Sequence, residues 1–252
     1  MSGAFDGPHI HLRTVGSTND YARALAERGA APGTIVTADE QTAGRGRHGR
    51  AWTTPPGAAL LCSAILRPVN PADALLPLAV PIAVCEAAEE LAPVRCQVKW
   101  PNDVWLGERK LAGILIEARP PEWAVIGIGL NLAIADDEFP ADLRWPATSL
   151  GHGVTPEDAL PALRRALGRW TQARAAEVRA EFARRDALRG REVSWRGAGS
   201  VPDGRGRAAG IDEHGRLVVE TADGPVALTA GEVQLTLSPN VQPSSSFFDD
   251  QG

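Results

Sequence analysis

The sequence has few cysteines and no long uninterrupted apolar segment, and both shortages exclude classes of protein. The cysteines Cys62, Cys85 and Cys96 show neither CxxC nor Cys/His metal-site spacing. Their odd number predicts reduced, mostly buried thiols of a cytoplasmic protein. The longest apolar run, residues 74–88, contains two prolines and a glutamate and is too short to span a bilayer. The first residues lack the basic and apolar regions of a signal peptide, so we predict a cytoplasmic protein without a membrane partner.

Aromatic residues and net positive charge are also scarce. Only 5% of the 252 residues are aromatic, and the formal net charge is −5. An acidic chain has no global basic field to attract DNA or RNA, and it offers few rings on which single-stranded bases could stack. Polyanion binding would therefore need a local cluster of cations. The 44% apolar and 23% charged residues are typical of a globular protein with a sizeable core.

Lysine is nearly absent. Only Lys99 and Lys110 stand among the 26 basic residues, and all the others are arginine. Codon bias explains the scarcity of lysine, because the chain is also rich in Ala, Gly and Pro, but it does not explain why the two lysines lie close together. Arginine cannot replace lysine where a compact ammonium with a tunable pKa is needed. The two lysines therefore mark a candidate site.

Hydrophobic periodicity predicts an α+β region in the first three quarters of the chain. A helix is expected with Ser17 or Thr18 as its N-cap and Gly29 at its end. A second helix is expected over residues 79–91, and a helical stretch with one apolar face over residues 155–188. The expected strands are residues 34–37, 58–66, 95–100, 103–106, 110–118 and 123–133, with a hairpin turn at 107–109.

Beyond residue 190 the pattern changes to about five short alternating strands, with turns at Asp223-Gly224 and His214-Gly215. Such a series is typical of a small antiparallel barrel. The fold class is therefore α+β, with a mixed or antiparallel sheet and flanking helices in residues 1–189. A small β-barrel is expected in 190–237 and a disordered Ser/Pro-rich tail in 238–252. Consecutive strands from 95 to 133 leave no room for the crossover helices of a Rossmann fold.

Three arginines alternate with glycines in the segment GRGRHGR, residues 44–50. Residues 43–52 show no periodicity, and we call them the Arg loop. Glycines allow backbone N–H groups to approach an anion, and arginines supply forked donors that match phosphate or carboxylate. The pattern predicts a cradle for a small polyanion, although a solvated arginine-rich loop explains the composition equally well.

Three segments further along the chain place polar groups or small residues beside open sheet surface. In KWPND, residues 99–103, Asp103 is a candidate Mg²⁺ ligand, although an Asx turn beside an exposed lysine is the commoner explanation. Gly113 lies on the strand after it, and Gly127 and Gly129 share one face of the next strand. Together these glycines leave space for a ligand against the sheet, whereas each one alone is as well explained by a bulge.

Together these segments resemble the biotin protein ligases, which join biotin to a carboxylase carrier domain. The matching stretches are STN (17–19), EQTAGRGRHGRAW (40–52), KWPNDVWLGERKLAGILIE (99–117) and GIGLN (127–131). Residues 210–235 resemble the small SH3-like C-terminal barrel of the family. The combination of GRGRxGR, KWPND and KLAGI is highly specific, and the resemblance covers nearly the whole chain.

The resemblance implies a two-step reaction in which ATP and Mg²⁺ activate biotin to biotinyl-5′-AMP. A lysine of the biotin carboxyl carrier domain of an acetyl-CoA or acyl-CoA carboxylase then accepts the biotin. No permanently bound cofactor is implied, and we expect a monomer or weak dimer. Many family members begin with a winged-helix DNA-binding domain. Here STN starts at residue 17, so we expect no DNA partner and no repressor function.

The resemblance also assigns the site residue by residue. Lys110, the lysine of KLAGI, takes the central catalytic role, with Arg45 and Arg47 beside it. The residues expected to bind biotin are Ser17, Thr18, Asn19, Gln41, Gly44, Arg45, Gly46, Arg47, Lys110, Gly113, Gly127 and Gly129. The residues expected to bind ATP are Arg47, Arg50, Trp52, Lys99, Asn102, Lys110 and Asn131, and Asp103 is the expected metal ligand.

The sequence departs from the family pattern at two places. His48 stands where the Arg loop often has another arginine, and residues 224–231 lack a tryptophan that some members place near the adenine. Because the Arg loop has no apolar anchor before Trp52 and its charges repel one another, we predict that it is mobile without ligand and ordered with biotinyl-AMP.

Two other functions stay open at this point. A lipoate or octanoate ligase or transferase could use the same fold, although the Arg loop argues against octanoyltransferases, which do not handle ATP. An RNA-binding protein could use the Arg loop and the barrel, although the acidic charge and the few aromatics argue against it.

Overall fold

The computed structural model describes residues 5–70, 74–143, 145–151, 153–196, 202–229 and 232–235. The chain divides into two compact units, one of residues 1–187 with 213–215 and one of residues 188–212 with 216–252. The domain limits expected from the sequence, 1–189 and 190–237, stay predictions. The expected tail, 238–252, lies outside the described residues.

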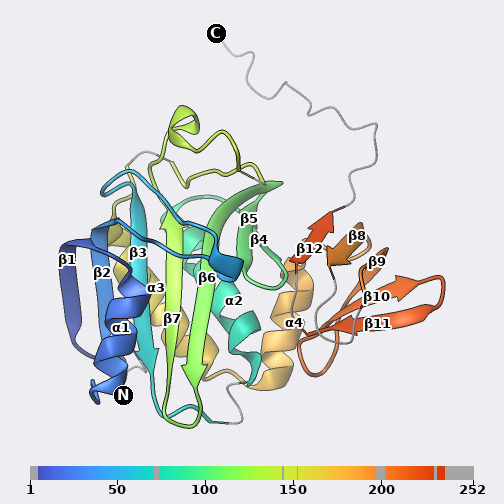
Figure 1. Ribbon diagram of the computed structural model, residues 1–252, viewed down its shortest axis with the longest axis horizontal. Coiled ribbons are helices and arrows are strands. Elements are labelled where there is room, and N and C mark those ends of the chain that lie inside the picture. The colour runs from blue at the N-terminus through green and yellow to red at the C-terminus, as the bar shows by residue number, and fades with distance from the viewer. Residues whose placement is uncertain are drawn as a thin grey trace. The chain divides into compact units, whose positions relative to one another are not determined.

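The larger unit is built on a seven-stranded mixed sheet in the order β1-β2-β3-β7-β6-β5-β4 (Figure 1). Its strands are β1 (His9–Val15), β2 (Ile35–Gln41), β3 (Ala59–Leu66), β4 (Cys96–Lys99), β5 (Asp103–Leu106), β6 (Arg109–Arg119) and β7 (Trp123–Asn131). β1 runs parallel to β2, and every other neighbouring pair is antiparallel. The mixed α+β class is therefore confirmed.

Helices cover both faces of this sheet. α1 (Thr18–Glu27) lies in front of the sheet in Figure 1, and its Ala22 and Ala26 pack against Val36, Ile65 and Trp123. α2 (Leu76–Leu91) and α3 (Pro156–Thr171) lie behind the sheet, and α4 (Ala175–Arg185) follows α3. α2 is buried on nearly all sides, which explains its continuous apolar sequence.

The observed elements correct several expectations. α2 begins three residues early, at Leu76, because Pro77 fits the first turn, where no backbone N–H is needed. The helical stretch expected over 155–188 is two helices. Arg174 is extended between them, and both helices pack against α2, so packing breaks the helix where the sequence has no Gly or Pro. Strand β1 was not predicted at all.

Other local expectations are confirmed. Gly29 follows α1 with a φ of +84°, the left-handed conformation that glycine favours at a helix end. Ser17 occupies the N-cap position, but its side chain makes no capping hydrogen bond. All three cysteines are buried and free, and burial raises the pKa of the Cys62 thiol to about 12. None of the helices in the described ranges is long and apolar enough to cross a bilayer.

The smaller unit is a five-stranded antiparallel sheet in the order β11-β10-β9-β8-β12. Its strands are β8 (Glu192–Arg196), β9 (Gly204–Ile211), β10 (Leu217–Thr221), β11 (Gly224–Leu228) and β12 (Glu232–Leu235). Gly215 and Gly224 have positive φ at the two expected turns. β11 and β12 form the edges, so within the described residues this small β-domain is an open sheet rather than a closed barrel.

Candidate functional site

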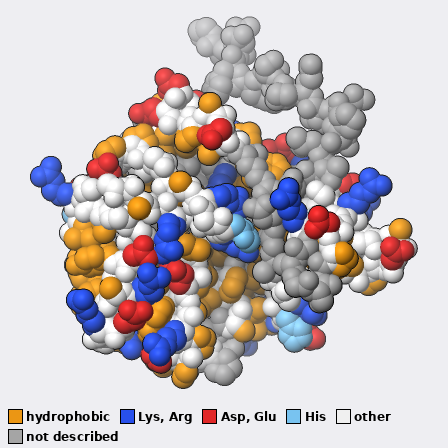
Figure 2. All heavy atoms as spheres, in the orientation of Figure 1, with side chains coloured by type: hydrophobic (Ala, Val, Ile, Leu, Met, Phe, Trp, Pro, Cys, Tyr) orange, Lys and Arg blue, Asp and Glu red, His pale blue; other side chains and the backbone are white. Residues whose placement is uncertain are grey.

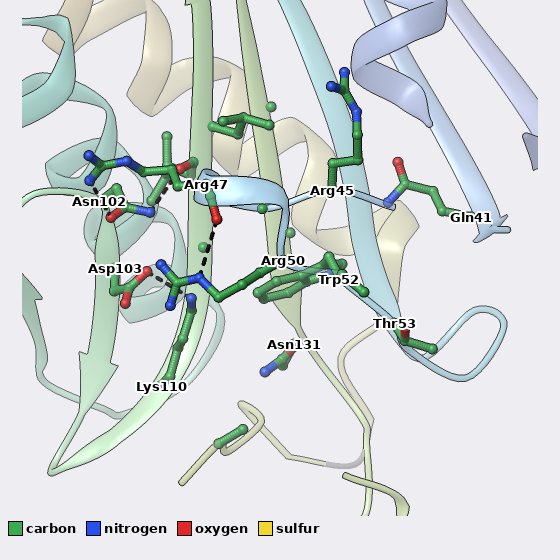
Figure 3. Close-up of a pocket in the computed structure, with 18 of the residues that line it drawn as sticks. Gln41, Arg45, Arg47, Arg50, Trp52, Thr53, Asn102, Asp103, Lys110 and Asn131 are labelled. Atoms are coloured by element: carbon green, nitrogen blue, oxygen red, sulfur yellow. Dashed lines mark hydrogen bonds and ion pairs between the residues drawn. The ribbon is translucent and has the colours of Figure 1, made fainter. Parts of the chain in front are cut away.

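A cavity of about 480 Å³ lies in the larger unit (Figure 3). Its lining comes from the start of α1, the end of β2, the Arg loop, strands β5, β6 and β7, and residues after β7 within 139–143 and 145–147. Figure 2 shows Lys and Arg side chains gathered beside a hollow in this face of the molecule. Of the site residues expected from the sequence, all line the cavity except Gly44 and Lys99.

One end of the cavity carries uncharged hydrogen-bonding groups. Thr18 and Asn19 begin α1 and are buried. Thr18 donates to Gln41 Oε1 through both its backbone N–H, at 2.7 Å, and its hydroxyl, at 3.0 Å. The buried Ser63 Oγ on β3 lies 2.7 Å from Asn19 Oδ1 and 2.8 Å from Thr18 Oγ1. Helix α1, the end of strand β2 and strand β3 are thus joined by one polar network.

The glycines in the cavity floor accommodate protein side chains in this structure. A Cβ on Gly127 would lie 2.1 Å from Asn19 Oδ1. A Cβ on Gly129 would lie 2.4 Å from the Trp52 ring, and one on Gly113 would lie 2.8 Å from it. The sequence predicted that these glycines leave space against the sheet, and the structure fills that space with Trp52 and Asn19.

The opposite end of the cavity is charged. Lys110 Nζ on β6 lies 2.8 Å from Asp103 Oδ1 on β5 and 5.4 Å from the centre of the Trp52 ring. Arg47 Nη1 donates to Asn102 Oδ1 at 3.1 Å, and Arg50 Nε donates to the Arg47 carbonyl at 3.2 Å. In Figure 3 the Arg50 guanidinium and the Lys110 amine lie beside Asp103, whereas the Arg47 guanidinium points toward Asn102. The cluster combines fixed guanidinium groups with one compact ammonium.

A sharp turn in the Arg loop brings Arg47 and Arg50 to this end. His48 has φ 57° and ψ 34°, and Gly49 has φ +72°. Gly46 N–H donates to the Arg50 carbonyl at 2.7 Å, which closes the turn. Two successive residues in the left-handed region suit His-Gly better than two larger side chains. The departure from the family pattern at His48 thus falls on a conformationally special position.

Arg45 differs from the other arginines of the loop. Its Nη2 lies 2.5 Å from Asp20 Oδ1 on α1 and 3.5 Å from Glu117 Oε1 on β6. In Figure 3 its guanidinium points away from Lys110 and Arg50. The structure therefore separates Arg45 from the cations with which the sequence grouped it.

Lys99 and Gly44 do not line the cavity. Lys99 is buried, and its Nζ lies 5.7 Å from the Trp105 ring and 5.3 Å from the Trp145 ring. A Cβ on Gly44 would meet the Trp52 carbonyl oxygen at 2.3 Å, so Gly44 allows the two ends of the Arg loop to approach. Their expected ligand contacts stay predictions, and in this structure both residues support their neighbours.

Several residues around the cavity were not predicted from the sequence. Ser63 lies on a strand without a motif, whereas Asp20 directly follows STN and Glu117 is the last residue of the stretch 99–117. The segment after β7 contributes Phe139, Pro140, Asp142, Leu143, Trp145 and Ala147 to the lining. Backbone hydrogen bonds tie this segment to β6, from Lys110 N–H to the Pro146 carbonyl at 2.7 Å and from Thr148 N–H to the Lys110 carbonyl at 2.9 Å. The isolated Trp145, in a chain with few aromatics, was the available signal.

Comparison with known families and proteins agrees with this architecture. Residues 12–131 match the biotin/lipoate A/B protein ligase family, and residues 190–236 match the biotin protein ligase C-terminal domain. The chain is 38% identical to biotin–[acetyl-CoA-carboxylase] ligase of Mycobacterium tuberculosis, over 86% of this chain and 85% of that protein. It is 31% identical to the bifunctional ligase/repressor BirA of Bacillus subtilis, over 91% of this chain and 74% of that protein.

Solved structures give the same result. The biotin protein ligase of Aquifex aeolicus in complex with biotin and ATP superposes with a TM-score of 0.77 at 30% identity. The match covers 92% of this chain and 99% of that one. Because sequence relatives, both domains and the fold agree over most of the length, this chain belongs to the biotin protein ligase family.

Proposed function

We propose that the chain is a biotin–[acetyl-CoA-carboxylase] ligase that works in two steps. In the first step the biotin carboxylate attacks the α-phosphorus of ATP, giving biotinyl-5′-AMP and releasing pyrophosphate. In the second step the ε-amine of a carrier-domain lysine attacks the biotinyl carbonyl carbon, loses a proton and releases AMP. The enzyme forms no covalent bond to either substrate in this scheme, so catalysis consists of positioning and charge stabilisation.

One observation carries this proposal: a single cavity has uncharged donors and acceptors at one end and three cations at the other. Two negatively charged substrates must meet for the first step, and negative charge spreads over phosphate oxygens in its transition state. Lys110, Arg47 and Arg50 supply positive charge where that transition state would form. Fixed cations in a cavity shielded from water stabilise developing charge strongly. We assign Lys110 to the α-phosphate and the biotin carboxylate.

The uncharged end suits the ureido ring of biotin, which has two N–H donors and one carbonyl acceptor. Ser63 has one hydroxyl proton but lies within hydrogen-bond distance of both Thr18 and Asn19. The Thr18 proton can go to Gln41 or to Ser63, but not to both. The network therefore has more oxygen contacts than hydroxyl protons. A ligand that brings N–H donors would satisfy the remaining oxygens.

Magnesium fits the charged end only as an ion held largely by ATP. No cluster of three or more metal-ligating side chains occurs among the described residues, but Mg²⁺ often binds through one carboxylate plus substrate phosphates. Asp103, at the rim of the sheet and 2.8 Å from Lys110 Nζ, is the residue that would hold it. Bound Mg²⁺ would neutralise phosphate charge, and Lys110 would stay close to the same oxygens.

The proposal is tested by adenylation with purified full-length protein. Incubation with α-labelled ATP, Mg²⁺ and biotin should yield labelled biotinyl-AMP, and addition of a biotin carboxyl carrier domain should consume it and biotinylate one lysine. Parallel reactions with lipoate and with octanoate test the other acids that could use this fold. Adenylation of lipoate in preference to biotin would overturn the proposal, and so would RNA binding without any adenylation. We expect a cytoplasmic enzyme, active as a monomer or weak dimer.

A further inference from the structure

Arg45 belongs to a compact ring of alternating charges beside the cavity. Asp20 Oδ1 lies 2.5 Å from Arg45 Nη2 and 2.7 Å from Arg23 Nη2. Glu117 Oε1 lies 3.5 Å from Arg45 Nη2 and 3.4 Å from Arg23 Nη1. Two guanidinium groups and two carboxylates therefore face one another with balanced charge. Figure 2 shows acidic and basic side chains intermingled over α1, in contrast to the gathered basic side chains at the hollow.

The ring joins three parts of the chain that are far apart in sequence. Asp20 and Arg23 lie in the first turns of α1, Glu117 lies near the end of β6, and Arg45 is its single member from the Arg loop. The ring also reaches the uncharged end of the cavity, because Asn19 Nδ2 donates to Glu117 Oε2 at 3.0 Å. The position of the Arg loop is thus connected to the orientation of Asn19.

From this geometry we propose that Arg45 is a positioning residue, which fastens the Arg loop to α1 and β6 through Asp20 and Glu117. This inference rests on the proposed function, and it changes the role of one residue within it. Arg45 then acts through the loop and Asn19 rather than by neutralising charge on biotin or ATP. Arg50, which lies beside Lys110 and Asp103 in Figure 3, and Arg47, which donates to Asn102, keep that role.

The strength of the ring sets the size of the expected effects. Its side chains are 25–43% exposed, so each pair alone contributes little and is screened by salt. Arg45 and Asp20, however, each have two partners of opposite charge, and charge networks hold better than isolated pairs. Loosening the ring should therefore change the opening of the loop several-fold, without unfolding the protein.

Hydrogen exchange in the ligand-free enzyme tests the fastening directly. The reporters are the amides of Ala43, Gly46 and Trp52, which donate to the carbonyls of Gly16, Arg50 and Gly44. Asp20→Asn leaves the loop sequence unchanged and should speed exchange across residues 43–52 by about 3- to 10-fold, which corresponds to the loss of a small charge network. Added salt should speed exchange in the wild type more than in the variant.

Two further variants guard against indirect effects. Asp20 lies in the first turn of α1, where a carboxylate also stabilises the helix. The variant Glu117→Gln therefore removes a different carboxylate of the ring, on β6, without changing the helix. The matched control is Glu90→Gln, which removes an exposed ion pair with Arg165 between α2 and α3, far from the loop. Unchanged exchange in both ring variants would overturn the proposal.

A double-mutant cycle of Arg45→Gln and Asp20→Asn then separates positioning from ligand contact. If Arg45 acts through the ring, both single variants shorten the lifetime of bound biotinyl-AMP to a similar degree, and the double variant is no worse than either. If Arg45 contacts the ligand, Arg45→Gln alone lowers adenylation steeply while Asp20→Asn leaves it intact, and the proposal fails. The exchange experiment uses no ligand, so it stays informative even if wild-type protein makes no biotinyl-AMP.

Discussion

The two ends of the cavity are built in different ways. The uncharged end consists of buried side chains on α1 and β3, held to one another and to β6 by hydrogen bonds within regular elements. The charged end depends on the Arg loop, whose Arg47 donates to Asn102 before β5, and on Lys110, which pairs with Asp103. Side chains held by helices and strands have their positions before the ligand binds. Side chains on a loop can change position when it binds. We therefore expect substitutions at the uncharged end to change biotin binding, and substitutions at the charged end to change the formation or release of biotinyl-AMP.

The largest effect is expected at the charged end, from Lys110→Arg. The substitution keeps the charge but replaces a compact ammonium with a broad planar group in a space already limited by Asp103 and Trp52. Adenylate formation should fall by at least about 10²-fold, the usual scale for one positioned electrostatic group. Single-turnover formation of biotinyl-AMP measures it, and thermal unfolding checks that the fold survives. A near wild-type rate would remove Lys110 from the central role.

At the uncharged end the corresponding change is Gly127→Ala. The new methyl would lie 2.1 Å from Asn19 Oδ1, so Asn19 must leave its place beside Ser63. Overpacking of this kind costs about 1–3 kcal/mol, and we expect the KM for biotin to rise by about 10-fold, with the KM for ATP changed much less. Gly16→Ala is the control, because a Cβ there meets nothing within 4 Å. Equal rises in both KM values would contradict the division into two ends.

Lys110 and Gly127 also show how much of the site could be predicted from the sequence. The motif around Lys110 predicted a charged site, and period-two spacing placed Gly127 and Gly129 on one face of β7. What stands on those glycines could not be predicted, because Trp52 and Asn19 reach them from distant segments. Asp20 and Glu117 escaped notice for the same reason. Their partner Arg45 lies 25 residues from Asp20, and no local sequence pattern predicts an ion pair over that separation.

Secondary structure shows the same limit. Buried strands such as β3 and β7 were predicted because their apolar runs are continuous. Strand β1 was missed, although Ile10 and Leu12 alternate with His9, His11 and Arg13, because only two apolar residues carry this short pattern. The break between α3 and α4 has no breaker residue, and it exists because both helices pack against α2. Tertiary packing thus decides boundaries that local propensity leaves open.

An effect of similar size, but on a different step, is expected from Arg47→Ala. Arg47 donates to Asn102 across the cavity, so its loss should free the Arg loop from the β5 rim. Release of biotinyl-AMP should accelerate by about 10-fold, the scale of one charge-assisted hydrogen bond, while the KM for biotin changes less. The lifetime of the bound adenylate in a chase experiment measures this. A larger change in biotin capture than in release would assign Arg47 to the first binding step.

The same loop carries the prediction of ligand-dependent order. The structure provides countercharges and hydrogen-bond partners for Arg45 and Arg47, yet the loop has no apolar anchor before Trp52. Binding of a biotinyl-AMP analogue should therefore protect residues 43–52 from protease and from hydrogen exchange more than the ligand-free ring does. Equal protection in both states would show that the loop is already ordered without ligand. The charged end would then be as preformed as the uncharged end.

The smallest effect on activity is expected from Glu89→Gln, which tests the scaffold behind both ends. Arg185 donates to both carboxylate oxygens of Glu89, at 2.6 and 2.9 Å, and the Cys96 N–H donates at 2.9 Å. Burial works to raise the pKa of Glu89, but these hydrogen bonds and the charge of Arg185 outweigh it and lower the pKa below its usual value. A lowered folded-state pKa stabilises the protein above the unfolded value of about 4.3, and this stabilisation is lost as the pH falls through the folded value.

Glu89→Gln should therefore lower the free energy of unfolding by about 1–2 kcal/mol at pH 7, as expected for a half-buried pair. The difference from wild type should shrink as the pH falls below about 4.3, and it should vanish below the lowered folded-state pKa, where the wild-type carboxylate is protonated in both states. Urea unfolding at several pH values measures this, with the exposed Glu90→Gln variant as the control. Biotin KM and adenylate lifetime should both stay at wild-type values, because the pair fixes α4 to α2 and contacts neither end of the cavity. A change in the biotin KM alone, or in the adenylate lifetime alone, would mean that the contact between α2 and α4 is coupled to the corresponding end of the cavity.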